Sequence, residues 1–121
     1  MSDIAALVEK YCAAWSEPDE VRRMSLLEGS FAQNGHYQDP TAALIGREAL
    51  SDHIGAIHAS SPGAKVEATS GIDHHNGHIR FTWHFVDGEG QEQIKGTDVC
   101  ELSAEGHLVK IVGFFDPPPE L

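Results

Sequence analysis

Two carboxylates in this sequence are placed where they could transfer protons. Asp39 follows Tyr37 by two residues in a segment that alternates like a strand, so both side chains are expected to point the same way. Asp98 falls inside a predicted strand, on the face that also carries Cys100 and Leu102. An ionised carboxylate is costly to bury there unless it is paired. Together the two acids suit general acid–base catalysis, in which one group moves a proton and another stabilises the developing charge.

Aromatic side chains are predicted close to these acids. Tyr11 and Trp15 lie one turn apart on the apolar face of the first predicted helix. Trp83 shares a strand face with other apolar residues, and Phe115 ends the last predicted strand. With Tyr37, these residues are expected to line one pocket for a small apolar molecule. If Tyr11 is buried, its hydroxyl needs a hydrogen-bond partner.

A structural interpretation of each residue stays open. Asp98 can be a buried acid that accepts hydrogen bonds from backbone amides or from a buried partner. Asp39 can be an ordinary turn residue before Pro40, and Tyr11 and Trp15 can be core residues. The pocket would then bind a small ligand without catalysis. The sequence therefore supports two functions of different classes, an acid–base enzyme and a binding or accessory domain.

Other kinds of catalytic or cofactor site find no support in the sequence. Three of the eight histidines, His74, His75 and His78, lie at a predicted hairpin tip, where neighbours on opposite strand faces cannot share one ion. No His-Glu-x-x-His, paired-cysteine, phosphate-binding glycine or Gly-x-Ser-x-Gly motif occurs. We therefore expect neither a metal nor another cofactor.

The composition favours a soluble protein with a single domain over residues 1–121. Only 8 Lys and Arg stand against 19 Asp and Glu, a net charge of -11 that argues against nucleic acid or an anionic membrane as partner. No apolar run is long enough to cross a membrane, and the N-terminus lacks the basic start of a signal peptide. Cys12 and Cys100 are too few for a disulfide scaffold, so we expect a reduced, cytoplasmic protein.

The first half of the chain has a helical period. Apolar residues at every third or fourth position from Ile4 to Trp15 predict a first helix, which Ser2 or Asp3 can cap and Pro18 ends. The same spacing predicts another helix over 46–59. A second helix between them is expected to turn Val21, Met24 and Leu27 inward and to end near Gly29, followed by an extended piece over 31–38.

After Pro62 the period becomes that of strands. Alternation and turn residues predict strands over 66–72, 78–86, 91–102 and 107–115. Their short connections require antiparallel neighbours, and the three helices must then lie on one face of the bent sheet, giving an α+β fold. The other face carries Val99, Val112 and Phe114, which are too apolar to stay in water, so we expect a homodimer through that face.

Five short motifs, in this order along almost the whole chain, resemble the nuclear transport factor 2-like superfamily, and in particular its SnoaL-like and ketosteroid-isomerase-like members. They are Tyr11-x-Ala-Ala-Trp15, Tyr37-x-Asp-Pro40, Gly46-Arg47-Glu48-Ala49-Leu50, Gly96-Thr97-Asp98 and Glu105-Gly106-His107-Leu108-Val109. The resemblance implies a cystatin-like cone, in which a bent, mixed and mostly antiparallel sheet holds three helices on its concave face. It says less about function, because this fold hosts isomerases, cyclases, dehydratases, hydrolases and binding domains.

The resemblance to ketosteroid isomerase implies catalytic roles for three residues. Asp39 would be the base, while Tyr11 and a protonated Asp98 would stabilise an oxyanion, as in the type case of a carboxylic acid kept neutral near pH 7. Ile54 stands where the isomerases have a supporting tyrosine, and Trp83 would fill space, which implies a ligand smaller than a steroid. Polyketide cyclases of the SnoaL type use a similar strand acid, so Asp98 alone would suit that reaction.

Overall fold

The change of period near Pro62 divides the chain into a mostly helical half and a half made of strands. The computed structural model describes residues 3–121, which form three helices and a seven-stranded sheet. The helices are α1 (Ile4–Trp15), α2 (Glu20–Glu28) and α3 (Arg47–Ser60). The strands are β1 (Phe31–Asp39), β2 (Ala42–Ile45), β3 (Lys65–Ala68), β4 (Asp73–His75), β5 (His78–Val86), β6 (Glu92–Leu102) and β7 (Leu108–Phe115).

Side-chain caps fix where the first two helices begin. The Asp3 carboxylate accepts a hydrogen bond from the Ala6 amide at 3.2 Å, and the Asp19 carboxylate accepts one from the Arg22 amide at 2.9 Å. Each bond satisfies an amide that has no partner within its helix. The second cap also sets the α1–α2 turn, which places α1 across the sheet.

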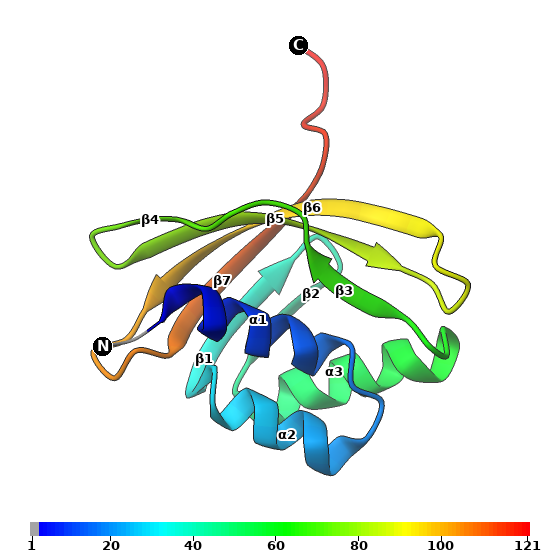
Figure 1. Ribbon diagram of the computed structural model, residues 1–121, viewed down its shortest axis with the longest axis horizontal. Coiled ribbons are helices and arrows are strands. Elements are labelled where there is room, and N and C mark those ends of the chain that lie inside the picture. Colours follow the sequence, from blue (N-terminus) through cyan, green and yellow to red (C-terminus); the bar gives the residue numbers. More distant parts are fainter. Residues whose placement is uncertain (1–2) are drawn as a thin grey trace.

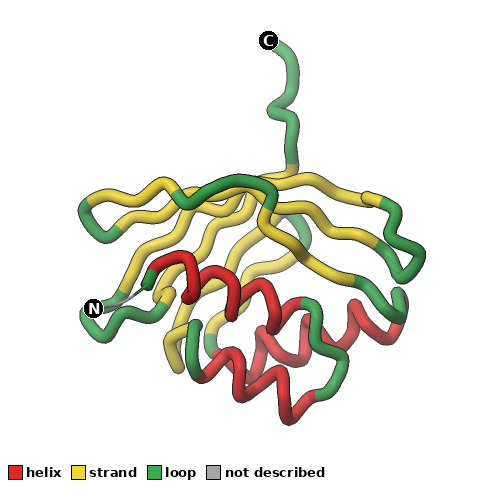
Figure 2. The backbone as a smooth tube through the Cα atoms, in the orientation of Figure 1, coloured by secondary structure: helices red, strands yellow, loops and turns green. Residues whose placement is uncertain are grey.

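The sheet is mixed, as the resemblance implies. Its strand order is β2-β1-β7-β6-β5-β3, and β4 pairs separately with β5. Only the β1–β7 pair is parallel; the other pairs among residues 3–121 are antiparallel. Figures 1 and 2 show the sheet curling over the helices, all three of which lie on its concave side. The predicted α+β architecture is therefore confirmed.

Two short strands, β2 and β4, are absent from the sequence-based prediction. Strands of four and three residues are too short for alternation to identify them. β2 pairs with β1 around a turn that contains Pro40, so that Asp39 lies opposite Ala42. The strand expected over 66–72 is also shorter in the structure, where β3 covers Lys65–Ala68.

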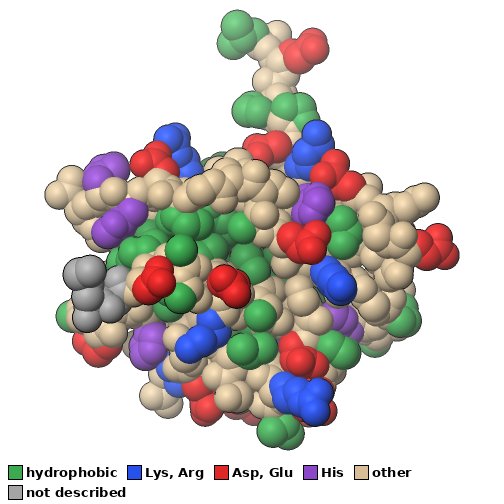
Figure 3. Space-filling model, in the orientation of Figure 1, with side chains coloured by type: hydrophobic (Ala, Val, Ile, Leu, Met, Phe, Trp, Pro, Cys, Tyr) green, Lys and Arg blue, Asp and Glu red, His purple; other side chains and the backbone are tan. Residues whose placement is uncertain are grey.

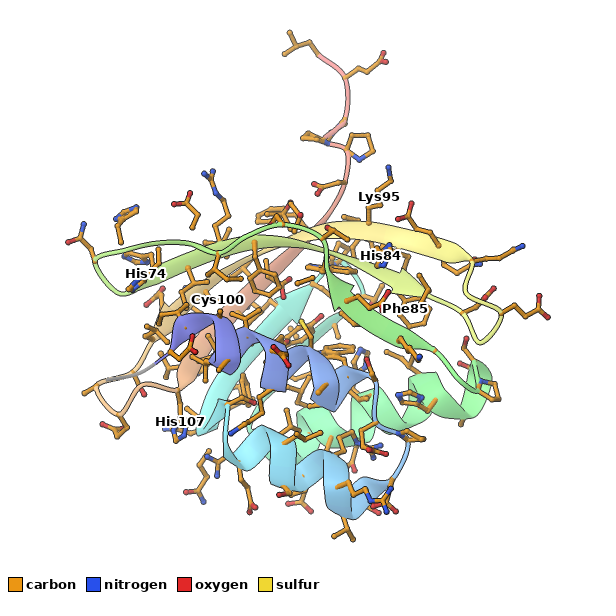
Figure 4. All side chains as sticks on the ribbon, viewed as in Figure 1. His74, His84, Phe85, Lys95, Cys100 and His107 are labelled. Atoms are coloured by element: carbon orange, nitrogen blue, oxygen red, sulfur yellow. The ribbon has the colours of Figure 1, made fainter. Side chains whose placement is uncertain are left out.

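The concave face of the sheet and the inner side of α1 form the core. Ile79, Phe81 and Trp83 alternate inward along β5 as predicted, and all three are buried. Figure 4 shows Phe85 and Cys100 on this same side of the sheet, whereas Lys95 points away from it. In the space-filling view, hydrophobic atoms gather between the sheet and α1, and acidic and basic side chains are scattered around them (Figure 3).

The inward face of α2 differs from the prediction. Val21, expected inside, is 78% exposed, and Met24 is only partly buried, whereas Arg23 is 4% exposed. Arg23 donates from Nε to the Ser51 hydroxyl at 2.9 Å and from Nη1 to the Glu17 carbonyl at 3.0 Å. These bonds satisfy the guanidinium and hold α2 against α3, and the helix therefore rotates to turn Val21 outward.

His58 is also buried. Its Nε2 lies 2.9 Å from the Trp15 carbonyl at the end of α1, while Nδ1 has no hydrogen-bond partner. This contact fixes the last turn of α1 relative to α3.

No helix within residues 3–121 is long and apolar enough to span a membrane.

The convex face of the sheet exposes apolar side chains. Val99 is 40% exposed and Phe114 is 57% exposed, and Val112 between them is partly buried. The segment after Phe115 extends away from the sheet (Figure 1) and does not fold back to cover this face. A second copy of the chain packed on this face would remove these side chains from water.

We predict that the protein is a homodimer formed through the convex face. Phe114→Lys should convert it to a monomer, because a charge at the centre of an apolar interface is costly to desolvate. Val21→Lys, on the opposite side of the molecule, is the matched control and should leave the dimer intact. Light scattering at micromolar concentration measures both masses, and a monomeric parent protein would contradict the prediction.

Candidate active site

One cavity of about 250 Å³ lies between α1, α3 and the concave face of the sheet. All seven residues selected from the sequence line it: Tyr11, Trp15, Tyr37, Asp39, Trp83, Asp98 and Phe115. They come from α1 and from strands β1, β5, β6 and β7. Alternation along the strands turns the five strand residues to one side of the sheet. Helical spacing places Tyr11 and Trp15 on the side of α1 that faces them.

Asp98 is the only acid among the buried side chains of residues 3–121, with 5% of its surface exposed. The indole Nε1 of Trp83 donates a hydrogen bond of 2.8 Å to Asp98 Oδ1. Burial raises the pKa of Asp98 from 3.8 to about 7; the Trp83 bond opposes this shift and the nearby charge of Asp39 adds to it. The carboxyl is therefore partly protonated near neutral pH and can donate as well as accept.

Two glycines make room for this arrangement. Gly96 lies opposite Trp83 in the β5–β6 ladder, and a Cβ added at Gly96 would come within 2.1 Å of the indole ring. Gly113 lies opposite Asp98 in the β6–β7 ladder, and a Cβ there would come within 2.9 Å of Asp98 Oδ1. Side chains at these positions would displace both partners of the Trp83–Asp98 bond.

The Tyr11 hydroxyl is buried and has no hydrogen-bond partner. Burial, and secondarily the Asp98 charge, raises the pKa of Tyr11 well above its ordinary value. The Trp15 side chain lowers the pKa of Tyr11 and so opposes this shift, although its contact with the Tyr11 hydroxyl does not have the geometry of a hydrogen bond. Because Tyr11 lines the cavity, its O–H is available to donate to a bound ligand.

Asp39 is more exposed and more fully hydrogen-bonded than Asp98. Its Oδ2 accepts a hydrogen bond from the Tyr37 hydroxyl, and its Oδ1 accepts bonds of 2.7 Å from both the amide and the hydroxyl of Thr41. Burial raises the pKa of Tyr37, and so does the bond to Asp39, so the phenol keeps its proton. These donors fix the orientation of the Asp39 carboxyl at the edge of the cavity.

Eight further residues line the cavity that the sequence did not assign to a site, and three of them, Cys12, Thr41 and His53, carry polar groups. The His53 ring packs edge-on against Trp15, with ring centroids 6.0 Å apart. Its position one helical turn before Ile57, which also lines the cavity, was the available signal. Thr41 lies just after the Asp39 turn, and no periodic pattern marks it. Burial raises the pKa of Cys12 to about 12, so its thiol stays protonated.

We predict that Asp98 makes stability depend on pH. Its pKa in the folded protein is about 7 against 3.8 when exposed, so the folded state binds the proton more tightly. The contribution of Asp98 to the unfolding free energy should therefore be highest below about pH 4 and should fall as pH rises to about 7, by on the order of 4 kcal/mol.

Asp98→Asn is the matched variant, because its amide oxygen can still accept from Trp83 while its charge is removed. The difference in unfolding free energy between parent and variant should change across this pH range and level off above it. Urea denaturation at several pH values measures that difference. A difference that stays constant from pH 4 to 8 contradicts the buried, protonated acid.

We also predict that Tyr11→Phe increases stability. The substitution removes a buried hydroxyl without a partner, which should raise the unfolding free energy by about 1 kcal/mol. Tyr37→Phe is the control, since it removes a donor to the charged Asp39 and should lower the unfolding free energy by about 2 kcal/mol. Equal losses in the two variants would indicate that Tyr11 has a hydrogen-bond partner in the unliganded protein.

Known structures share this fold, although no protein-family model and no curated protein matches the sequence. A ketosteroid-isomerase-like structure from Catenulispora acidiphila DSM 44928, in complex with trimethylamine, is 16% identical, with a TM-score of 0.73 over 91% of this chain and 85% of that one. A candidate SnoaL-like polyketide cyclase from Jannaschia sp. CCS1 is 13% identical, with a TM-score of 0.68 over 96% of this chain and 90% of that one.

One further solved structure has a higher sequence identity to this chain than the two above. A SnoaL-like protein from Agrobacterium tumefaciens str. C58, named as a candidate isomerase, is 32% identical to this chain. The match covers 93% of this chain and 97% of the other, with a TM-score of 0.85. The resemblance deduced from the sequence motifs is confirmed, and the chain belongs to the SnoaL-like family within the nuclear transport factor 2-like fold.

Proposed function

We propose that this protein catalyses proton transfer next to the carbonyl group of a small, largely apolar ligand. The observation that carries this proposal is the buried Asp98 carboxyl, with a pKa of about 7, in the same apolar cavity as the unpartnered Tyr11 hydroxyl. Two neutral oxygen acids facing one cavity form a site for a developing oxyanion. The second carboxyl, Asp39, accepts hydrogen bonds from Tyr37 and Thr41 and is the candidate base.

In the proposed reaction, Asp39 removes a proton from the carbon next to the carbonyl. The electron pair of that C–H bond forms a carbon–carbon double bond, and the carbonyl π electrons move onto oxygen. Tyr11 and protonated Asp98 donate hydrogen bonds to this oxygen. If the proton on Asp39 is first replaced by one from solvent, its return to the same carbon gives hydrogen exchange. In a β,γ-unsaturated ketone, return of the proton to the γ-carbon of the dienolate moves the double bond. A positioned base typically contributes about 10²–10⁴-fold in rate, and an oxyanion donor about 10²–10³-fold.

The hydrogen bonds to Asp39 favour a second candidate mechanism. Three donors already occupy its two oxygens, so neither oxygen is free of a hydrogen bond when the ligand binds. Asp98, with one free oxygen and a pKa of about 7, could then act alone as acid and base, as in a cyclase of the SnoaL type. In that mechanism Asp39 only orients the ligand.

We predict that Asp39→Asn lowers the rate of proton exchange by about 10²-fold or more, because it removes the basic oxygen and keeps the side-chain shape. The assay is incorporation of deuterium into small cyclic ketones in D₂O, followed by NMR. Glu105→Gln, an exposed acid in the β6–β7 turn, is the charge-matched control and should exchange at the parent rate.

The outcomes separate the candidate functions. If Asp39→Asn retains the parent rate while Asp98→Asn loses it, the single-acid mechanism is correct. If the parent protein binds the ketones but exchanges them no faster than buffer, the protein is a binding domain. Circular dichroism must first establish that each variant is folded.

A further inference from the structure

The cavity carries acidic side chains but no lysine or arginine. Among the fifteen lining residues are two acids, Asp39 and Asp98, one histidine, His53, and no Lys or Arg. No ion pair formed by residues 3–121 includes either acid. Asp98 is almost fully buried with a single hydrogen bond, and its carboxyl keeps a proton in the proposed reaction. The Asp39 carboxylate is therefore the group that attracts a positively charged ligand and repels an anionic one.

The walls of the cavity favour the same kind of ligand. Seven of the lining side chains carry six-membered aromatic rings: Tyr11, Trp15, Tyr37, Phe81, Trp83, Phe85 and Phe115. Trp83 and Phe115 meet edge to face, with centroids 6.2 Å apart and an interplanar angle of 83°, so the two rings present their faces in different directions. Aromatic faces carry negative potential and attract cations, most strongly where water is excluded.

The hydrogen-bonding groups of the cavity favour an alkylated ammonium ion over a primary one. A primary ammonium group needs acceptors for three N–H bonds. Asp98 offers one free oxygen, whereas both oxygens of Asp39 already accept bonds from Tyr37 and Thr41. An alkylated ammonium group needs few or no acceptors and presents an apolar methyl surface to the aromatic walls. The volume of about 250 Å³ is below the ~300–1,000 Å³ of drug-sized sites, so the ligand is small.

We propose that the substrate of this site is a small ketone that carries a tertiary or quaternary ammonium group. The ketone half of this inference rests on the proposed function, in which Tyr11 and Asp98 hold the carbonyl oxygen. The ammonium half rests on the acids and aromatic rings alone. The cation contacts the aromatic walls and is attracted to the Asp39 carboxylate at short range, while Asp98 keeps its proton and donates to the carbonyl oxygen.

A pair of isosteric ketones tests the two halves separately. The 1,1-dimethyl-4-oxopiperidinium ion and 4,4-dimethylcyclohexanone have nearly the same shape and differ in one ring atom, a charged nitrogen or a neutral carbon. We expect the cation to bind the parent protein about 10-fold more tightly or better at neutral pH. Quenching of tryptophan fluorescence, checked by NMR titration, measures both dissociation constants.

Variants locate the source of the preference. Asp39→Asn should reduce the ratio of the two dissociation constants several-fold, because it removes a carboxylate from the cavity. Asp98→Asn replaces a partly protonated carboxyl by a neutral amide and should reduce the ratio less. Glu105→Gln changes the net charge by the same amount on the surface and should leave the ratio unchanged. Equal affinity for both ketones, tighter binding of the neutral ketone, binding of neither, or a ratio that is the same in all three variants would overturn the inference.

The same two compounds report on the proposed function independently. Deuterium exchange at the carbons next to each carbonyl is compared with the buffer rate for that compound. If both ketones exchange but bind equally, catalysis stands and the cationic substrate is wrong. If the cation binds preferentially but neither ketone exchanges, the site is a binding site for organic cations and the proposed catalysis is wrong.

Discussion

Burial of the Asp98 carboxyl beneath the curled sheet is the constraint on which the site depends. The desolvated carboxylate receives one hydrogen bond, from Trp83 Nε1 at 2.8 Å, which is too little to keep it fully ionised at neutral pH. The protein therefore holds a group that is costly for folding in the middle of an apolar cavity. Costs of this kind are typical of functional sites, where stability is exchanged for a group with a shifted pKa.

The topology of the sheet brings the second acid to the first. Asp98 lies on β6 and Asp39 at the end of β1, and β7 runs between them, antiparallel to one and parallel to the other. Gly113 of β7 is the residue between the two acids. A Cβ built on it would lie 2.9 Å from Asp98 Oδ1 and 3.5 Å from the Cβ of Asp39. The missing side chain lets the two carboxyls share one cavity, and the charge of Asp39 then contributes to the raised pKa of Asp98.

Periodicity was sufficient to predict most of the fold and the direction of the site residues. The alternation along β5 placed Trp83 inward, and the helical spacing in α1 placed Tyr11 and Trp15 on one face. It failed where burial follows hydrogen bonding: Arg23 is buried because backbone carbonyls and Ser51 accept its N–H bonds, and Val21 is displaced outward. His58 is buried with its Nε2 against the Trp15 carbonyl, although its Nδ1 has no partner. Pairings between distant segments, such as the indole bond to Asp98 and its support by Gly96, leave no local pattern in a sequence.

The pKa of the Asp98 carboxyl is the quantity whose measurement tests the proposed site most directly. Carbon-13 labelling of the aspartate carboxyls, with the Asp98→Asn variant to assign the signal, gives its titration curve directly by NMR. The account predicts a midpoint near 7, about three units above that of an exposed aspartate. A midpoint near 4 would show that the carboxyl is hydrated or otherwise compensated, and neither the oxyanion site nor the proton transfer assigned to this cavity would then have a physical basis.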